Sequence, residues 1–426
     1  MPTALKRITD TFKRRGLDWI TANVPYNLHR FAPVGLENVC RGNMNGADCL
    51  EYPGPRGETA VTIPHDLYTS TADFMRTDAF DTDTGTVRVQ GEAHAWKIRR
   101  GRIYTNATHQ YFAISQANRI VAGASYNHDI ALAGKSGNEL TLSARFFPEP
   151  VHFSGTVASL VLGGGPATNI FHWMMDALPR LHLIEQIMPL DDIDHFVVQG
   201  ADNGFRLRSL EMLGIPASKV HFFTDQLIHI QADELLLGSH PRGWLSNISP
   251  DWSNTFHRNR YLSNMRPVQR IWPKKIYISR RDSSLRGVAN EEALFDQLKA
   301  HGYQEILLSE YNYDEKIALF HHAREVISMS GAGLGFLVYC QPGTRVLELF
   351  PAGFVHYANA ALAAQADLDY HYLVFGDPAA GINSRDAQRQ PLQVDHRQIQ
   401  AVLDNWSAMS QTDLAKPAVS DTQKSL

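Results

Sequence analysis

A histidine, an aspartate and an arginine recur at intervals of four residues in the segment NIFHWMMDALPRL, residues 169–181. Positions four apart in an α-helix lie within about 40° of each other around the axis. A helix here would therefore place His172, Asp176 and Arg180 in one stripe. The free N–H groups at a helix start favour a neutral imidazole, which accepts a proton, and a carboxylate one turn away orients it. The spacing predicts either a His–Asp dyad for base catalysis or a structural network of ion pairs and hydrogen bonds.

A second group of reactive residues lies in SRRDSSLRGVAN, residues 279–290, between a predicted strand and a predicted helix. Arg280, Arg281 and Arg286 supply three permanent cations, and the fork of an arginine pairs with two phosphate oxygens. A diphosphate group needs such a site. A solvated basic loop is the alternative that this segment alone leaves open. Asn290 is expected to cap the helix that follows.

The segment SGAGLG, residues 330–335, predicts a turn from a strand into a helix. Glycines let the backbone approach a ligand closely, and the N–H groups of the next helix point at an anion. The segment has neither the Walker lysine nor a clear G-x-G-x-x-G pattern, so by itself it is a weak signal. Glu348 lies near the carboxyl end of the next predicted strand. There it could accept hydrogen bonds from ribose hydroxyls, or it could be satisfied within the protein.

Two short segments match the D-x-D pattern of metal-dependent sugar transferases, DTD at 81–83 and DLD at 367–369. Matches of three residues often arise by chance, and neither segment ends a clear strand of the Rossmann type. His321 and His322 lie in an amphipathic helix and are expected to face solvent or a neighbouring element. The sequence therefore predicts no metal site.

The elements that position these residues alternate between strands and helices from about residue 155 onward, which predicts parallel sheets covered on both faces. In such sheets ligands bind beyond the carboxyl ends of the strands. Two units in tandem, with the pattern restarting after Pro273, suggest a cleft between them. Strands are expected at 156–162, 195–199, 219–223, 234–238, 275–279, 304–309, 326–330 and 345–350, and helices at 169–181, 204–213, 250–265, 291–301, 314–323 and 335–341.

The predicted fold class is therefore α/β, with two Rossmann-like domains facing a cleft and a strand-rich accessory region before them. The accessory region covers residues 1–150, where short alternating runs are broken by Gly and Asn. The two Rossmann-like domains cover 151–268 and 269–405. The polar tail 406–426 contains no aromatic residue after Trp406 and is expected to be disordered.

The bulk composition excludes several classes of protein. With 426 residues and a net charge of −4, a strongly basic nucleic-acid-binding protein is not expected. Three cysteines are too few for a disulfide framework, so we expect reduced thiols in a cytoplasmic protein, although Cys40 and Cys49 could pair. No apolar run approaches the roughly 18–20 residues that span a bilayer. The basic, amphipathic first twenty residues predict either weak contact with anionic lipid at the inner face of the membrane or docking on the protein itself.

Together, three segments resemble glycosyltransferase family 61, the DUF563 group, which includes bacterial polysaccharide-biosynthesis proteins. NIFHWMMDALPRL is similar to the family's N-x-F-H-W…D-x-L-P-R segment, ISRRDSSLRGVANEEAL to S-R-R…R…N-E, and SGAGLGFLVYCQPGTRVLELFP to H-G-A-G-L…P-G-x-x-V-x-E. Their order and spacing match over roughly residues 155–352. The chain departs from the family at Ser330, where His is usual, and at Phe336, where Asn is usual.

The resemblance implies a GT-B fold, with the nucleotide-sugar bound mainly by the C-terminal domain and the catalytic base on the N-terminal one. It implies metal-independent, inverting transfer from a nucleotide-diphosphate sugar, with no separate cofactor, to a glycan or lipid-linked acceptor of surface polysaccharide assembly. His172 is favoured as the base and Asp176 as its orienter, although these roles could be reversed, and Asn169 and Arg180 support them. The implied donor site comprises Arg280, Arg281, Arg286, Asn290, Ser330, Gly331, Ala332, Gly333, Leu334 and Glu348.

Two other functions fit the same layout. A nucleotide-sugar epimerase can share two Rossmann-like domains, and it would need no acceptor. A catalytically degenerate subunit would bind a nucleotide-sugar or a glycan and turn nothing over.

Overall fold

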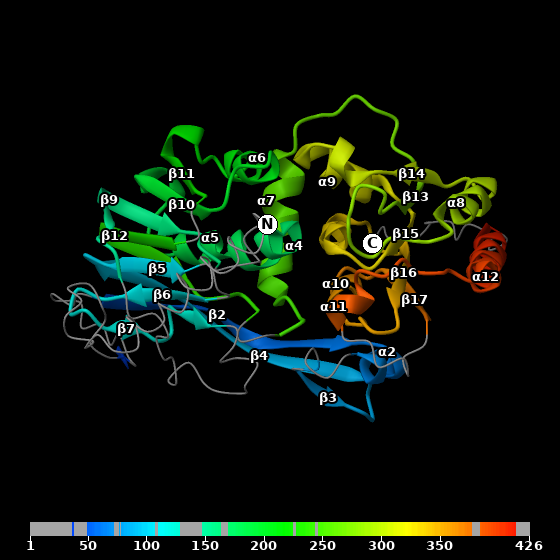
Figure 1. Ribbon diagram of the computed structural model, residues 1–426, viewed down its shortest axis with the longest axis horizontal. Coiled ribbons are helices and arrows are strands. Elements are labelled where there is room, and N and C mark those ends of the chain that lie inside the picture. The colour runs from blue at the N-terminus through cyan, green and yellow to red at the C-terminus, as the bar shows by residue number, and fades with distance from the viewer. Residues whose placement is uncertain are drawn as a thin grey trace, which may run out of the picture.

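The computed structural model describes residues 36–37, 49–71, 76, 78–106, 110–127, 147–162, 169–224, 227–242, 246–376 and 384–414. The predicted N-terminal amphipathic helix and the glycines at 163–165 lie outside these residues. The described part contains two β-sheets, one at each side of Figure 1, and each carries a group of parallel strands. We refer to the parts built on them as the first unit and the second unit.

The first unit contains a parallel group of four strands in the order β11-β10-β9-β12. The two strands that follow β9 in the chain, β10 and β11, are added on one side of it. The next strand, β12, is added on the opposite side of β9. The order therefore reverses between β9 and β12, which is a topological switch point. The strands are β9 (Val151–Ser159), β10 (His195–Gln199), β11 (Val220–Phe223) and β12 (Leu227–Gly238). The helices are α4 (Ile170–His172), η5 (Trp173–Ala177), α5 (Pro179–Ile184), α6 (Phe205–Glu211) and α7 (Asp251–Asn264).

The second unit is a sheet of five parallel strands in the order β14-β13-β15-β16-β17. Its switch point lies between β13 and β15. The strands are β13 (Lys275–Ile278), β14 (Gln304–Ile306), β15 (Glu325–Met329), β16 (Arg345–Pro351) and β17 (Asp369–Phe375). The helices are α8 (Glu291–Ala300), α9 (Tyr313–His322), η9 (Ala332–Tyr339), α10 (Ala358–Gln365), α11 (Ser384–Ala387) and α12 (His396–Leu414).

Three details of the second unit differ from the prediction. The sequence did not indicate α10 and β17, because an alanine-rich stretch and a strand of mixed polarity give little periodicity. The predicted helix at 335–341 is a 3₁₀-helix that begins earlier, at Ala332. Finally, α12 continues to Leu414, so the predicted disordered tail does not begin at residue 406. Trp406 is buried, which anchors this helix on the sheet.

The N-terminal strands belong to the first sheet, which has twelve strands within the described residues. The long strands β2 (Cys49–Thr62) and β4 (Thr86–Arg99) form an antiparallel ribbon, and residues 95–99 of β4 pair with β12. A boundary at residue 150 therefore falls inside a continuous sheet. The remaining strands are β1 (Leu36–Glu37), β3 (Ala79–Asp81), β5 (Arg102–Asn106), β6 (Gln110–Ile114), β7 (Ile120–Val121) and β8 (Tyr126–Asn127).

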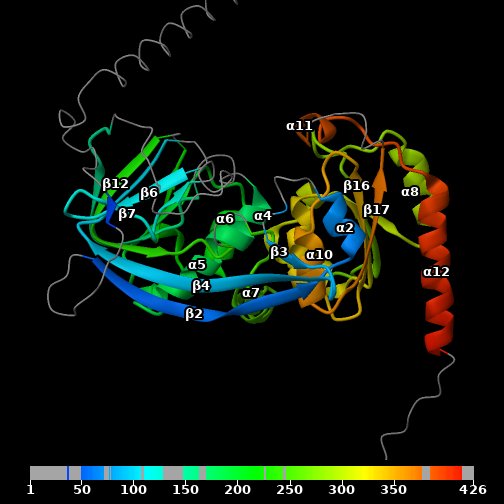
Figure 2. The same cartoon turned by 90° about the horizontal axis from the view of Figure 1, so that it is seen from below.

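The β2–β4 ribbon extends from the first unit to the second, as Figure 2 shows from below. Its far end and helix α2 (His65–Ser70) form one apolar cluster with the second unit, in which Val61 and Leu67 pack with Phe350 and Tyr357. Asp78, near this end, accepts hydrogen bonds from the N–H of Asn247 at 3.0 Å and the hydroxyl of Tyr357 at 2.7 Å. The strand-rich region thus connects the two units.

The cysteines differ from the expectation of three reduced thiols. Cys49 is disulfide-bonded to a partner outside the described residues, whereas Cys340 is free and buried. The expectation failed because it relied on the small number of cysteines, which does not decide whether two of them lie together. Among the described residues, no helix is both long and apolar enough to cross a membrane.

Candidate active site

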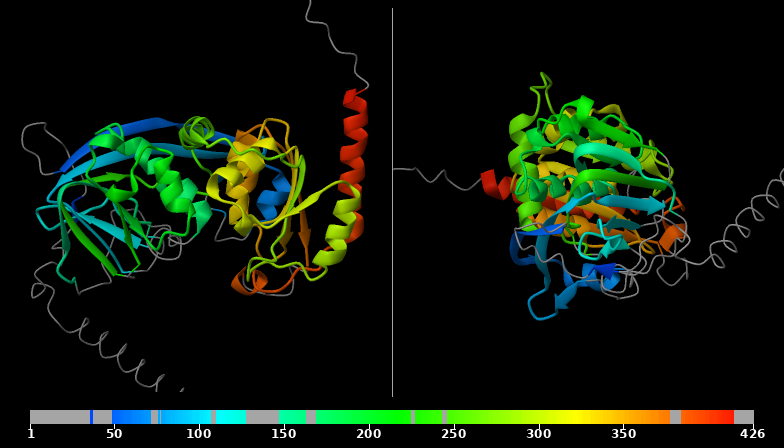
Figure 3. Two further views of the ribbon diagram at one scale, coloured as in Figure 1. Left: turned by 90° about the horizontal axis from the view of Figure 1, so that it is seen from above. Right: turned by 90° about the vertical axis from the view of Figure 1, so that its left-hand side faces the viewer.

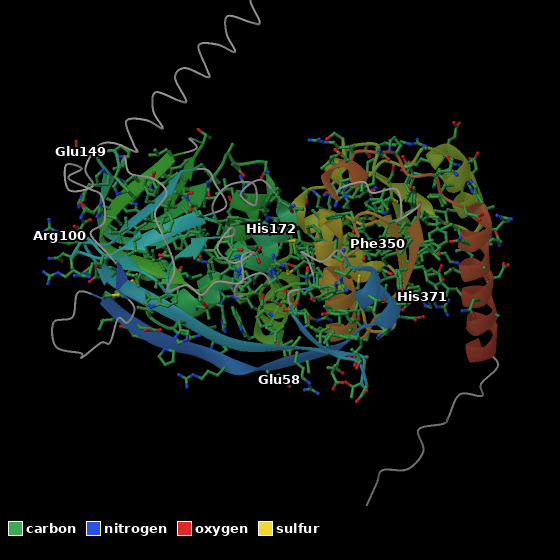
Figure 4. All side chains as sticks on the ribbon, turned by 60° about the horizontal axis from the view of Figure 1, so that its bottom comes forward. Glu58, Arg100, Glu149, His172, Phe350 and His371 are labelled. Atoms are coloured by element: carbon green, nitrogen blue, oxygen red, sulfur yellow. The ribbon has the colours of Figure 1, made fainter. Side chains whose placement is uncertain are left out.

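A pocket of about 140 Å³ lies between the two units. In Figure 4, His172 marks its place near the middle of the molecule, with the second unit to its right. All of the lining residues follow the carboxyl ends of parallel strands. Four of these strands, β9, β12, β13 and β15, flank the two switch points, and the fifth, β16, lies next to β15. The first unit contributes Asn169, Phe171, His172, Arg242 and Asn247, and the second contributes Arg286, Gly331, Ala332, Phe354, His356, Ala358 and Asn359.

The segment that carries His172 is an interrupted helix. Asn169 is its N-cap, with Oδ1 accepting the N–H of Phe171 at 2.8 Å. The helix then widens into the π-helical turn η5, and Pro179, which has no N–H to donate, begins α5. Such π-turns inside helices are frequent at functional sites. The backbone can come close to the second unit here, because a Cβ on Gly335 of η9 would lie only 3.2 Å from the ring of Phe171.

His172 and Asp176 form the pair that their spacing predicts. Nδ1 of His172 lies 2.6 Å from Oδ2 of Asp176. The His172 side chain is 32% exposed and reaches the pocket, whereas that of Asp176 is 1% exposed and lies behind it. Only one member of the pair is therefore accessible to a substrate.

Arg242, which was not among the residues predicted from the sequence, completes this arrangement. Its Nε lies 2.6 Å from Oδ1 of Asp176 and one terminal nitrogen 2.8 Å from Oδ2, so both carboxylate oxygens are occupied. Burial opposes ionisation of Asp176, but the charge of Arg242 and hydrogen bonds from Arg242 and His172 hold its pKa well below the usual range. Asp176 therefore stays ionised and is placed to orient His172.

His240 lies on the other side of Asp176, with Nε2 3.8 Å from Oδ2 and its ring stacked on Tyr126. Burial lowers the pKa of His240 to about 4, so its imidazole is neutral near pH 7. His240 and Arg242 both follow the carboxyl end of β12. That position was a usable signal, because the end of this strand was predicted from the sequence.

Arg180 does not join the predicted polar stripe. Its guanidinium donates to the carbonyls of Gly238 at 3.0 Å and Val161 at 2.8 Å, and it lies over the ring of Tyr111. The prediction assumed 3.6 residues per turn, but the wider π-turn changes the rotation between positions 176 and 180. Arg180 instead ties together the ends of β9 and β12, next to the switch point.

Arg286 is the arginine of the 279–290 loop that lines the pocket. Its backbone adopts a positive φ of 56°, and its guanidinium lies 5.3 Å from the ring centre of Phe354. Burial, together with the nearby charge of Arg280, lowers its pKa to about 10, so it remains a cation. Arg280 lies behind it and donates to Ser283 Oγ at 2.6 Å and to the Leu285 carbonyl at 3.1 Å.

Arg281 and Asn290, which were expected at the donor site, do not line this pocket. Arg281 is half-exposed and pairs with Glu291 and Glu305 at 3.7 and 3.5 Å. Asn290 occupies the N-cap position of α8, but its side chain makes no cap hydrogen bond. It instead exchanges two hydrogen bonds with the backbone of Val394, which fixes the segment before α12.

The 330–334 segment is divided between the pocket and the interior. Gly331 and Ala332 line the pocket. A Cβ on Gly331 would lie 2.8 Å from a terminal nitrogen of Arg280, so a side chain there would require the guanidinium to shift. Ser330 and Leu334 are buried, and Gly333 packs against Leu308.

Glu348 is buried behind the pocket and does not line it. Its carboxylate accepts hydrogen bonds from Asn359 Nδ2 at 2.7 Å and the Tyr370 hydroxyl at 2.6 Å. Burial outweighs these bonds and raises its pKa to about 7. The structure thus favours the alternative of a carboxylate satisfied within the protein. Its neighbours His356 and Asn359, which were not among the residues predicted from the sequence, line the pocket instead.

Among the described residues, no group of three or more His, Cys, Asp or Glu side chains is arranged to hold a metal ion. Residues 170–347 match the family model described as Glycosyltransferase 61. No curated protein matches the chain. The matched range contains the His172–Asp176 pair, Arg242, the loop at 279–290 and the turn at 330–334. The chain therefore carries a glycosyltransferase family 61 domain, and it is an enzyme of the glycosyltransferase class.

Proposed function

We propose that this glycosyltransferase moves a sugar from a nucleotide-diphosphate sugar to a hydroxyl of a glycan or lipid-linked acceptor, with inversion and without a metal ion, in surface polysaccharide assembly. One observation carries the proposal. A histidine oriented by a buried carboxylate and an arginine without a carboxylate partner among the described residues face the same pocket from two sheets, each near a switch point.

His172 is the general base in this proposal. Because Asp176 is ionised, Nδ1 of His172 carries the proton and donates it to Oδ2, which leaves the lone pair of Nε2 for an acceptor hydroxyl. Asp176 and Arg242 hold the ring in place. The charge of Arg242 balances the carboxylate, so the pair remains buried with its hydrogen bonds satisfied.

Arg286 and the start of η9 bind the diphosphate. The guanidinium of Arg286 has its Nε without a hydrogen-bond partner among the described residues. The N–H groups after Gly331 begin a helix at the same pocket wall, and helix starts favour anions. A fixed cation at the leaving group stabilises the charge that develops there, which is the work of a metal ion in other sugar transferases.

The reaction that follows is a single displacement. The acceptor oxygen attacks the anomeric carbon as its proton passes to Nε2 of His172. The bond from the anomeric carbon to the diphosphate oxygen breaks, and its electron pair leaves with the diphosphate beside Arg286. The described lining residues include no carboxylate that could act as a nucleophile, and this supports inversion rather than a double displacement.

The arrangement of the two units supports a GT-B layout. In both units the loops at the carboxyl ends of the parallel strands meet at one pocket. Figure 3 shows the units next to each other from above, with the β2–β4 ribbon along one edge of both. On this proposal the first unit carries the base and the second binds the donor.

The test is a thermal-shift panel of UDP, GDP and dTDP and their common sugar conjugates, with and without EDTA. A ligand of the folded state raises the melting temperature, so one nucleotide should raise it to the same extent in EDTA. The matching nucleotide-sugar is then incubated with glycan and polyprenyl-linked acceptors, and release of the nucleotide diphosphate is followed.

His172→Ala should keep the thermal shift and lose transfer. A shift that requires metal would contradict the metal-independent step. If no nucleotide shifts the wild-type protein, the proposed donor class is wrong.

A further inference from the structure

Two residues after β16, His356 and Asn359, line the pocket and have no role in the steps above. Each has one polar atom without a hydrogen-bond partner among the described residues, Nδ1 of His356 and Oδ1 of Asn359, and both atoms are shielded from bulk solvent. Buried polar atoms in folded proteins nearly always have partners. Two unpaired atoms on one pocket wall indicate that a ligand completes them.

The unpaired atom of Asn359 is an acceptor. Its amide nitrogen donates to Oε1 of Glu348 at 2.7 Å, which assigns the remaining atom as the carbonyl oxygen. An amide oxygen can only accept hydrogen bonds. Asn359 thus presents a fixed acceptor, held in place from the protein interior.

The unpaired atom of His356 is also an acceptor. The hydroxyl of Ser330 donates to the carboxylate of Glu348, so its oxygen is free to accept from Nε2–H of His356, 3.1 Å away. This tautomer leaves a lone pair on Nδ1. Burial and the charges of Arg286 and Arg242 lower the pKa of His356 to about 3, so the imidazole stays neutral.

A pair of acceptors restricts the chemistry of the ligand. Phosphate and carboxylate oxygens without a proton cannot satisfy an acceptor, whereas a hydroxyl group donates to it. In the proposed function, phosphate lies at Arg286 and the acceptor hydroxyl at His172. The group between them that carries several hydroxyls is the ring of the sugar being transferred.

We propose that Nδ1 of His356 and Oδ1 of Asn359 accept hydrogen bonds from hydroxyl groups of the transferred sugar and so select the donor sugar. This inference rests on the proposed function. Since both atoms are shielded from solvent, the sugar reaches them when a neighbouring side chain shifts. The half-buried ring of Phe354, which lines the pocket 5.4 Å from the imidazole, is placed to move in this way.

The experiment compares the affinity for a nucleotide-sugar with that for its nucleotide diphosphate. The probes are the pairs UDP-glucose with UDP and GDP-mannose with GDP, measured by titration calorimetry, and the pair that wild type binds more tightly is used. His356→Phe keeps a ring but removes the acceptor, and His356→Asn restores an acceptor close to the Nδ1 position. His371→Phe is the control, because His371 contacts Trp406 and does not line the pocket.

We expect His356→Phe to weaken binding of the nucleotide-sugar by about five- to tenfold, which is the contribution of one hydrogen bond. Binding of the nucleotide diphosphate should weaken by less than twofold. His356→Asn should recover part of the loss, and His371→Phe should behave as wild type. If His356→Phe lowers the affinity for both ligands equally, or leaves both affinities unchanged, the inference is overturned and the proposed function stands. Wild type that binds neither these two pairs nor dTDP and its sugar conjugates would overturn both.

A second measurement does not depend on the variant folding. Wild type is titrated with analogues of the bound nucleotide-sugar, each lacking one hydroxyl of the sugar. At least one of these analogues should bind wild type about five- to tenfold more weakly than the parent nucleotide-sugar. If every deoxy analogue binds wild type as the parent does, the sugar hydroxyls meet no acceptors and the inference is wrong.

Discussion

Asp176→Asn tests the proposed base most directly, because the change keeps the shape of the side chain and removes its charge. In the variant, Arg242 should retain the amide oxygen, which leaves the amide N–H₂ facing Nδ1 of His172. The imidazole then has to accept at Nδ1 and carry its proton on Nε2, the nitrogen that takes the proton of the acceptor hydroxyl. We expect the transfer rate to fall by about 10²–10⁴-fold, the range seen when a base is lost or held in the wrong tautomer.

The same substitution has a cost in stability that follows from burial. The Arg242 side chain is 11% exposed and that of Asp176 1%, so the variant leaves a buried cation without its counter-charge. Breaking a buried pair from one side costs about 3–5 kcal/mol. Replacing both partners removes that penalty, so Asp176→Asn combined with Arg242→Met should melt at a higher temperature than Asp176→Asn alone. Transfer should remain low in both proteins.

The assays are initial transfer rates at saturating donor, donor affinity by titration, and melting temperature. Donor affinity should stay within twofold in Asp176→Asn, because the diphosphate lies on the opposite wall. A variant with the wild-type rate would show that Asp176 does not orient the base. A double variant no more stable than the single one would show that the buried charge of Arg242 is not the source of the loss.

Three further predictions concern the donor site and the dependence of stability on pH. Arg286→Ala should weaken nucleotide diphosphate binding by about tenfold or more, whereas Arg281→Ala, outside the pocket, should change it by less than twofold; equal effects in calorimetry would contradict the assignment. Gly331→Ala should also weaken binding, because its Cβ would displace the guanidinium of Arg280, and wild-type affinity would show that the turn tolerates a side chain. Acid should destabilise the fold between about pH 6.5 and 4, because burial lowers the pKa values of four histidines to about 3–4. In this pH range the unfolded chain binds protons that the folded chain does not. The four histidines are His229, His240, His257 and His356. Glu348, with its pKa raised to about 7, acts in the opposite sense between about pH 4.5 and 7, but it is one group against four. Urea unfolding at a series of pH values measures the slope, and a free energy of unfolding that is flat or rises toward pH 4 would contradict it.

The His172–Asp176 pair could be predicted because both residues lie in one short segment, where helical spacing alone brings them together. The strand and helix alternation after residue 155 was predictable for the same reason, since each element has its own periodicity. The π-turn was not, and it moved Arg180 out of the stripe. Local patterns therefore predicted the His172–Asp176 pair correctly, but they placed Arg180 beside it wrongly.

Such local patterns do not predict contacts between segments that are far apart in the chain. Arg242 meets Asp176 from a loop 66 residues away in the chain. Its place after a predicted strand makes it a candidate site residue but does not indicate which side chain it meets. Arg281 and Arg286 look alike in the sequence, yet only Arg286 lines the pocket, because the backbone of the loop decides where each side chain points. The pairing of β4 with β12 is also long-range, which is why the N-terminal strands were expected to form a separate region.

The ribbon of β2 and β4 also restricts how the two units can move relative to each other. The two units are joined by the segment after α7 at the upper edge of Figure 1 and by the ribbon at the lower edge. Because the units are attached at opposite edges, rotation about one attachment would strain the other. Entry of a donor and departure of its diphosphate then depend on movements of individual loops and side chains around the pocket. Cutting the ribbon should release a rotation of the two units that the intact chain does not have.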